Sequence, residues 1–268
     1  MIMKKIRILW VVIVTIVTTN LLAFDFSSLP NKLSAYYIAP AQSINLVKSK
    51  LKANGFEILA TTNILKGYNV ITITNSELKA TNSYMATLNI NVNPNEIRVQ
   101  NPSYLGAAYL REQYRYGQFK ATIYALEKAL GSLKESSQKM EYSKLKDYQF
   151  MFGMPKFDDV ITVREGRNLI NRLKAHEESI AYMLTLPNGV ILVGHKLRKK
   201  TNRFLRTLSQ EKNAQILPYK SMLYANAAQI LDPKYYLALC LPLLSMGEFM
   251  EIASTPNDIE KEIKRAYR

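Results

Sequence analysis

Two related segments occur in this chain, and this internal repetition constrains the fold more than any other feature of the sequence. Ile97–Leu110 (IRVQNPSYLGAAYL) aligns with Ala228–Leu241 (AQILDPKYYLALCL), and Pro102 then falls on Pro233. One repetition at so long a spacing is typical of two copies of a supersecondary unit, because a solenoid needs three or more shorter repeats. We therefore expect two units of similar architecture.

The pattern within each half indicates hairpins and helices together. Met85–Val92 alternates apolar and polar residues, and a turn at Asn93-Pro94-Asn95 leads into the next apolar run. In the second half, Pro187-Asn188-Gly189 separates two further runs typical of strands. We also predict a strand over Tyr148–Met154 and a helix over Thr162–His176. The expected fold is α+β, with two similar α/β units, each a largely antiparallel sheet with packed helices, after an N-terminal signal helix.

These patterns divide the chain into five parts. They are a signal peptide over residues 1–23, a linker over 24–34, unit A over 35–133, a second linker over 134–147 and unit B over 148–268.

The order of the expected elements resembles domain of unknown function 302, a small bacterial α/β family that includes exported tandem forms. The most similar segment is Leu217–Ile252, in which Leu217-Pro218 opens a strand and Leu241-Pro242 forms a turn. The first half departs from this pattern, because Leu110-Arg111 stands where the second half has Leu241-Pro242. The resemblance implies a fold, and it implies no activity and no catalytic residues.

The first 23 residues predict export. A basic start with Lys4, Lys5 and Arg7 precedes an apolar run from Ile8 to Val17, and small residues end at Ala23. These are the parts of a secretory signal, and the run is shorter than the ~20 residues a membrane span needs. We expect cleavage after Ala23 and a periplasmic protein. A retained segment would instead anchor the protein to the inner membrane as a tethered scaffold.

A strong positive charge is the clearest hint about partners. The chain has a net charge of +15, and +12 remains without the three basic residues of the signal. Such a charge suits nucleic acid or an anionic surface, and export argues against nucleic acid. We therefore expect an anionic lipid, a glycolipid or an acidic protein as partner. The expected anion-binding residues, on a short helix over 199–208 and just before it, are Lys196, Arg198, Lys199, Lys200, Arg203 and Arg206.

Catalytic motifs are missing from the sequence. The two histidines, His176 and His195, have no metal-ligand spacing around them, and the chain has no G-x-S-x-G motif and no glycine-rich phosphate loop. We expect no catalytic residues, no metal, no cofactor and a non-enzymatic role. The alternative is an enzyme with a site between the two units. The sequence does not fix the oligomeric state.

Overall fold

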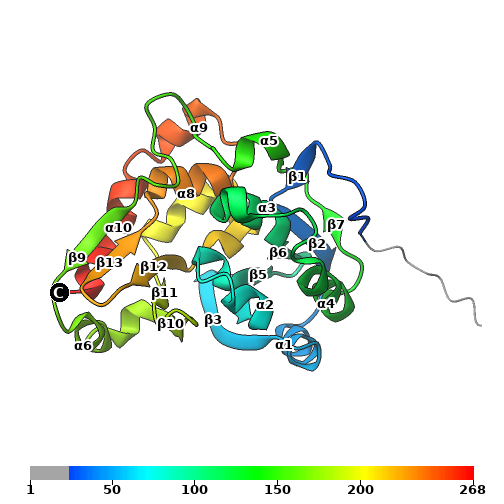
Figure 1. The fold of residues 1–268 in the computed structure, drawn as a ribbon. Coiled ribbons are helices and arrows are strands. Elements are labelled where there is room, and N and C mark those ends of the chain that lie inside the picture. The colour runs from blue at the N-terminus through cyan, green and yellow to red at the C-terminus, as the bar shows by residue number, and fades with distance from the viewer. Residues whose placement is uncertain (1–23) are drawn as a thin grey trace, which may run out of the picture.

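The structure, a computed structural model, describes residues 24–268 and has the expected α+β architecture of antiparallel sheets with packed helices (Figure 1). The expected signal peptide and its helix lie outside the described residues. Within residues 24–268, no helix combines the length and the apolar character that crossing a membrane requires.

Unit A is built on a six-stranded antiparallel sheet with the order β3-β4-β5-β6-β2-β7. Its strands are β2 (Tyr36–Pro40), β3 (Glu57–Leu65), β4 (Tyr68–Thr74), β5 (Leu88–Val92), β6 (Glu96–Gln100) and β7 (Lys134–Glu135). Its helices are α1 (Ile44–Ala53), α2 (Ser76–Lys79), α3 (Pro102–Tyr109) and α4 (Lys120–Leu130), with 3₁₀ turns η1 (Tyr84–Ala86) and η2 (Arg111–Gln113). Helices α1 and α4 pack side by side (Figure 1).

Unit B is built on a five-stranded antiparallel sheet with the order β10-β11-β12-β13-β9. Its strands are β9 (Ile161–Glu165), β10 (Ile180–Thr185), β11 (Ile191–His195), β12 (Tyr219–Leu223) and β13 (Ala227–Ile230). Its helices are α6 (Leu169–Lys174), α7 (Phe204–Thr207), α8 (Pro233–Cys240), α9 (Met246–Glu251) and α10 (Thr255–Ala266), with 3₁₀ turns η3 (Glu177–Ser179), η4 (Thr201–Arg203) and η5 (Glu211–Ile216).

The two sheets share one strand order. The order β3-β4-β5-β6-β2 in the sheet of unit A corresponds strand by strand to the order β10-β11-β12-β13-β9 in unit B. All neighbouring pairs are antiparallel. The helices that follow β6 and β13 begin in the same way. Asn101 caps α3 and Asp232 caps α8, and each is followed by proline at the first helical position. A short acceptor side chain and a proline are both favoured there, because the first N–H groups of a helix have no partner within it.

The units pack against each other through equivalent elements. Edge strands β3 and β10 contact each other, η5 of unit B lies on strands β4, β5 and β6, and η1 of unit A lies on β12. As a result β5 and β12 are buried at every position. One continuous hydrophobic core runs through both units.

Two predictions about unit B are wrong. Residues 148–154 form loops and turns rather than a strand, and residues 162–165 belong to β9 rather than to a helix. Ile161 and Val163 are more buried than Thr162 between them, which is the period of a strand. The helix begins only at Leu169, after Gly166 and Asn168 in left-handed conformations.

Both expected linkers contain regular structure. Strand β1 (Lys32–Ser34) pairs with β8 (Lys139–Glu141), and β7 adds to the edge of the unit A sheet at β2. Helix α5 (Tyr142–Leu145) follows β8 directly. The segment between the units is therefore packed onto unit A.

Candidate functional site

A groove of about 680 Å³ lies where the end of β3 in unit A meets unit B. Strand β3 contributes residues 62–64, and unit B contributes the segment around η3, the residues that follow β11, and the last turns of α10. Its lining residues are Thr62, Asn63, Ile64, His176, Glu178, Ser179, Lys196, Leu197, Arg198, Lys199, Asn202, Glu262, Arg265, Ala266 and Arg268.

Positive charge dominates this groove. Five of the lining residues are lysine or arginine, and two are glutamate. Four of the basic side chains form no ion pair with any carboxylate of residues 24–268: Lys196, Lys199, Arg265 and Arg268. Unpaired cations that face a common cavity from different segments provide a site for an anion.

The fifth basic residue, Arg198, is exposed but already paired with a carboxylate of the protein. Glu262 of α10, with a side chain that is 7% exposed, accepts hydrogen bonds from the Arg198 backbone N–H and from its Nε, both at 2.8 Å. The Thr201 hydroxyl donates to the same carboxylate. Burial acts to raise the pKa of Glu262, but the hydrogen bonds from Thr201 and Arg198 outweigh it and lower the pKa below its usual value. Arg198 therefore ties the segment after β11 to α10.

The structure separates the six predicted anion-binding residues into two groups. Lys196, Arg198 and Lys199 line the groove, while Lys200, Arg203 and Arg206 are exposed and lie outside its lining. The single helix expected over 199–208 is instead a 3₁₀ turn, η4, followed by the single turn α7. Leu205 and Leu208 are buried, and this fixes the outward direction of Arg206.

Arg265 and Arg268 complete the basic groove and were not identified from the sequence. The apolar residues Ile259, Ile263 and Ala266 recur at helical spacing and form the buried face of α10. That period places Arg265 away from the core. It does not indicate that the end of α10 lies beside the segment that follows β11.

A second open groove, of about 550 Å³, lies beside Tyr84 and Tyr109. Its basic residue Arg111 is already paired, with Asp158 at 2.6 Å and Asp147 at 3.5 Å. Glu112, on the same wall, is paired with Lys146 at 2.8 Å. Charge in this groove is therefore locally balanced, in contrast to the basic groove.

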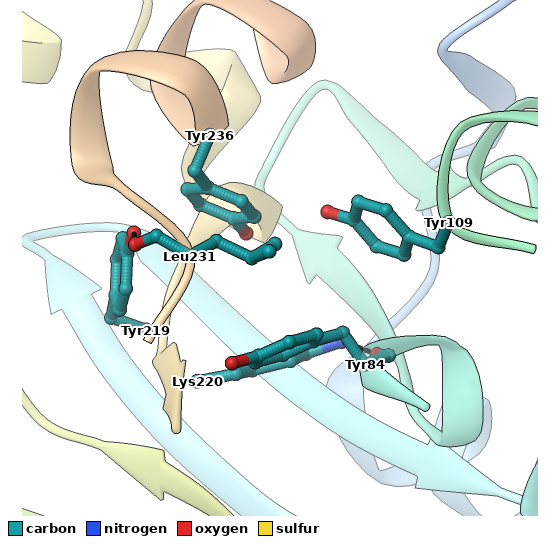
Figure 2. A pocket seen from close by; sticks show the side chains of 6 residues that line it. All are labelled: Tyr84, Tyr109, Tyr219, Lys220, Leu231 and Tyr236. Carbon is teal, nitrogen blue, oxygen red and sulfur yellow. Dashed lines mark hydrogen bonds between the residues drawn. The ribbon is translucent and has the colours of Figure 1, made fainter. Parts of the chain in front are cut away.

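Lys220 is a buried lysine at the junction of the units. It extends from β12 into a small cavity of about 10 Å³ lined by Leu231 and four tyrosines, namely Tyr84, Tyr109, Tyr219 and Tyr236 (Figure 2). Its Nζ donates to the carbonyl oxygens of Thr87 at 2.8 Å and of Tyr84 at 3.1 Å, both in unit A. A neutral amine has two N–H groups, which match these two carbonyls, whereas protonation adds a third.

Burial lowers the pKa of Lys220 to about 7, because the charged amine is poorly solvated there. A cavity of this size holds about one water molecule at most, so it has no room for a substrate. In this conformation Lys220 therefore links the two units by hydrogen bonds and is inaccessible to small molecules. No local pattern in the sequence indicates this role, because the partners of Lys220 lie in unit A, far from it along the chain.

His195 also lies in the core of unit B. Its Nε2 is 2.7 Å from the Ser221 hydroxyl, which in turn is 2.7 Å from the Tyr267 hydroxyl. Burial lowers the pKa of His195 to about 3, so the ring is neutral at physiological pH. Its Nδ1 has no partner among residues 24–268, and Ser221 is fully buried. This chain of groups therefore lacks the carboxylate and the substrate access of a catalytic triad.

Residues 24–268 contain no cluster of three or more histidine, cysteine, aspartate or glutamate side chains with the geometry for a metal ion. Cys240 is buried at the end of α8, and burial raises the pKa of its thiol to about 12. Such a thiol is unreactive at neutral pH.

The basic groove is thus open and has a lining with more positive than negative charge, so its chemistry suits the binding of an anion. Comparison of the chain with models of protein families, with curated proteins and with solved structures finds no match.

Proposed function

We propose that this protein is an exported, non-enzymatic binding protein that holds a phosphate-bearing anion in the basic groove between its two units. The observation that carries this proposal is the convergence of Lys196, Lys199, Arg265 and Arg268 on one groove without ion-pair partners. Arginine binds phosphate oxygens through two parallel N–H groups, and lysine adds a compact charge. The positive charge of the whole chain favours the approach of an anionic partner.

Export belongs to the same proposal and rests on the basic, apolar and small-residue pattern of the first 23 residues. In the cell envelope, the anions that such a groove would meet include lipid headgroups, glycolipid phosphates and acidic proteins. A groove of 680 Å³ has the size of a site for a small ligand or a headgroup.

We also propose that the chain arose by duplication of one unit and that unit B alone kept the anion site. The shared strand order and the matching caps of α3 and α8 support a duplication. The segment after β4, equivalent to the one after β11, has Lys79 as its one basic residue, and Glu57 pairs with it at 3.2 Å. One ligand per chain is therefore expected.

Isothermal titration calorimetry with inorganic phosphate at low ionic strength tests the proposal. The groove variant carries Lys196→Ala, Lys199→Ala and Arg265→Ala, and the control variant carries Lys200→Ala, Arg203→Ala and Arg206→Ala. Both lose three positive charges. We expect the groove variant to bind phosphate about 100-fold more weakly and the control to bind nearly as the wild type does. Equal losses in the two variants would mean that overall charge, rather than the groove, attracts phosphate.

A further inference from the structure

The lining of the basic groove carries more positive charge than its own carboxylates can balance. Four exposed basic side chains in it have no ion-pair partner among residues 24–268: Lys196, Lys199, Arg265 and Arg268. Of the two lining carboxylates, Glu262 already pairs with Arg198 at 2.8 Å, and Glu178 lies 3.7 Å from His176. Leaving His176 aside, the five basic and two acidic residues leave an excess of three positive charges.

These cations come from two segments that the structure ties together beside the groove. Lys196 and Lys199 flank Arg198, whose Nε lies 2.8 Å from the Glu262 carboxylate on α10. Arg265 follows Glu262 by three residues, which is about one turn, or ~4.5 Å along the helix axis. The lysine pair and the arginines at the end of α10 are therefore within reach of one small ligand.

A single phosphate group does not neutralise this excess of charge. A phosphate monoester carries about −1.5 to −2 charges at pH 7, so at least one cation of the groove would remain without a counter-charge. A second phosphate group on the same ligand supplies it and also separates the cations, which otherwise repel one another. Both kinds of cation suit this group, since arginine binds phosphate oxygens through two N–H groups and lysine adds a compact charge.

We infer that the ligand is a diphosphate ester, with one phosphate group beside Lys196 and Lys199 and the other beside Arg265 and Arg268. This inference rests on the proposed function, and it adds the chemical class of the ligand. A groove of 680 Å³ is much larger than a phosphate ion, so it has room for both phosphate groups and part of the esterified group.

Inorganic phosphate and pyrophosphate test the number of phosphate groups that the groove holds. Equilibrium dialysis of the full-length protein at low ionic strength counts the ions bound per chain, without divalent cations because these bind pyrophosphate. We expect two phosphate ions per chain but one pyrophosphate, bound about 100-fold more tightly because its second phosphate group binds within the same molecule. One phosphate ion per chain, together with equal affinities for the two probes, would overturn the inference and leave the proposed function standing. If neither probe binds, the proposed function fails as well.

Double variants make the test specific to the two positions. One carries Lys196→Ala and Lys199→Ala, and the other carries Arg265→Ala and Arg268→Ala. Each should bind one phosphate ion per chain and lose most of the preference for pyrophosphate. The control carries Lys200→Ala and Arg203→Ala, which remove the same charge outside the groove lining, and it should keep the preference. All these side chains are exposed, so the three variants should fold. Equal losses of the preference in all three would overturn the inference.

Two esters distinguish the sources of such a diphosphate. Ile64, Leu197 and Ala266 add apolar residues to the lining, beside which an alkyl chain or a flat ring can lie. Tighter binding of farnesyl diphosphate than of uridine diphosphate would assign the site to a lipid, and the reverse order would assign it to a soluble nucleotide. If both esters bind more weakly than inorganic phosphate, the assignment to a diphosphate ester is overturned.

Discussion

Asn89 and Lys220 are the second residues of the equivalent strands β5 and β12, and each donates from its side chain to a main-chain carbonyl of the other unit. Asn89 Nδ2 reaches the carbonyl oxygen of Leu217 at 3.2 Å, and Lys220 Nζ reaches that of Thr87 at 2.8 Å. The two units are therefore held together by reciprocal hydrogen bonds in the core. One of the two donors is ionisable, so the junction is sensitive to pH.

Replacement of Lys220 by methionine should change how stability depends on pH. The pKa of Lys220 is lowered from 10.5 to about 7 by burial, so between these values the unfolded chain binds a proton that the folded protein does not. The buried amine therefore lowers the free energy of unfolding by its full amount below pH 7, and this destabilisation decreases as the pH rises toward 10.5. Urea denaturation should show the wild type gaining about 3 kcal/mol relative to Lys220→Met between pH 6.5 and 9.5. Parallel stability curves would contradict a neutral buried lysine.

Substitution of Gly194 by alanine should strongly destabilise the protein. A Cβ atom at this position in β11 would clash with ring carbons of Tyr182, whose hydroxyl lies 3.0 Å from the Thr87 hydroxyl in unit A. The ring must move out of the core, so we expect a loss of about 2–4 kcal/mol in the free energy of unfolding. Gly247→Ala in α9 is the control, since its Cβ would meet one atom at 3.9 Å, and it should be neutral or slightly stabilising. Comparable thermal shifts for the two variants would contradict this packing.

Glu262→Gln should lower the stability of the protein and raise its affinity for phosphate. Hydrogen bonds hold the pKa of Glu262 below its usual value against the effect of burial, so its stabilising effect is present above the unfolded pKa and is lost as pH falls through the folded pKa. We expect the variant to lose about 1–2 kcal/mol at pH 7 and to match the wild type more closely near pH 3. Its affinity for phosphate should rise, because a carboxylate leaves the groove. Lower affinity together with intact stability would show that Glu262 acts through the ligand rather than through Arg198.

Expression with the native N-terminus should yield a mature chain that starts at Phe24. The basic start, short apolar run and small residues before the cut are the features that a signal peptidase recognises. Intact mass spectrometry of the periplasmic fraction measures this directly. A mass that includes residues 1–23, found in the membrane fraction, would favour the tethered scaffold instead.

Much of the fold could be read from local patterns. The alternation in Met85–Val92 and the turn after it predict a hairpin, and β5 and β6 form one, although the strand begins only at Leu88, after the 3₁₀ turn η1. The repetition of Ile97–Leu110 in Ala228–Leu241 coincides with a strand followed by a capped helix in both units. The prediction failed over 148–154 and over 162–165. The aromatic-rich segment at 148–154 has the composition of a strand but no strand partner, and Ile161–Glu165 pairs with β13 far along the chain.

The sequence by itself determined the α+β class, the two similar units and three of the five basic residues of the groove, namely Lys196, Arg198 and Lys199. Only the tertiary structure decided that Arg265, Arg268, Thr62 and Asn202 join them and that Lys200, Arg203 and Arg206 do not. Local structure follows from backbone preferences and the period of apolar residues, which a short segment contains in full. The groove follows from how β3, η4 and α10 pack together, and that packing is set by the shape and burial of side chains from both units at once.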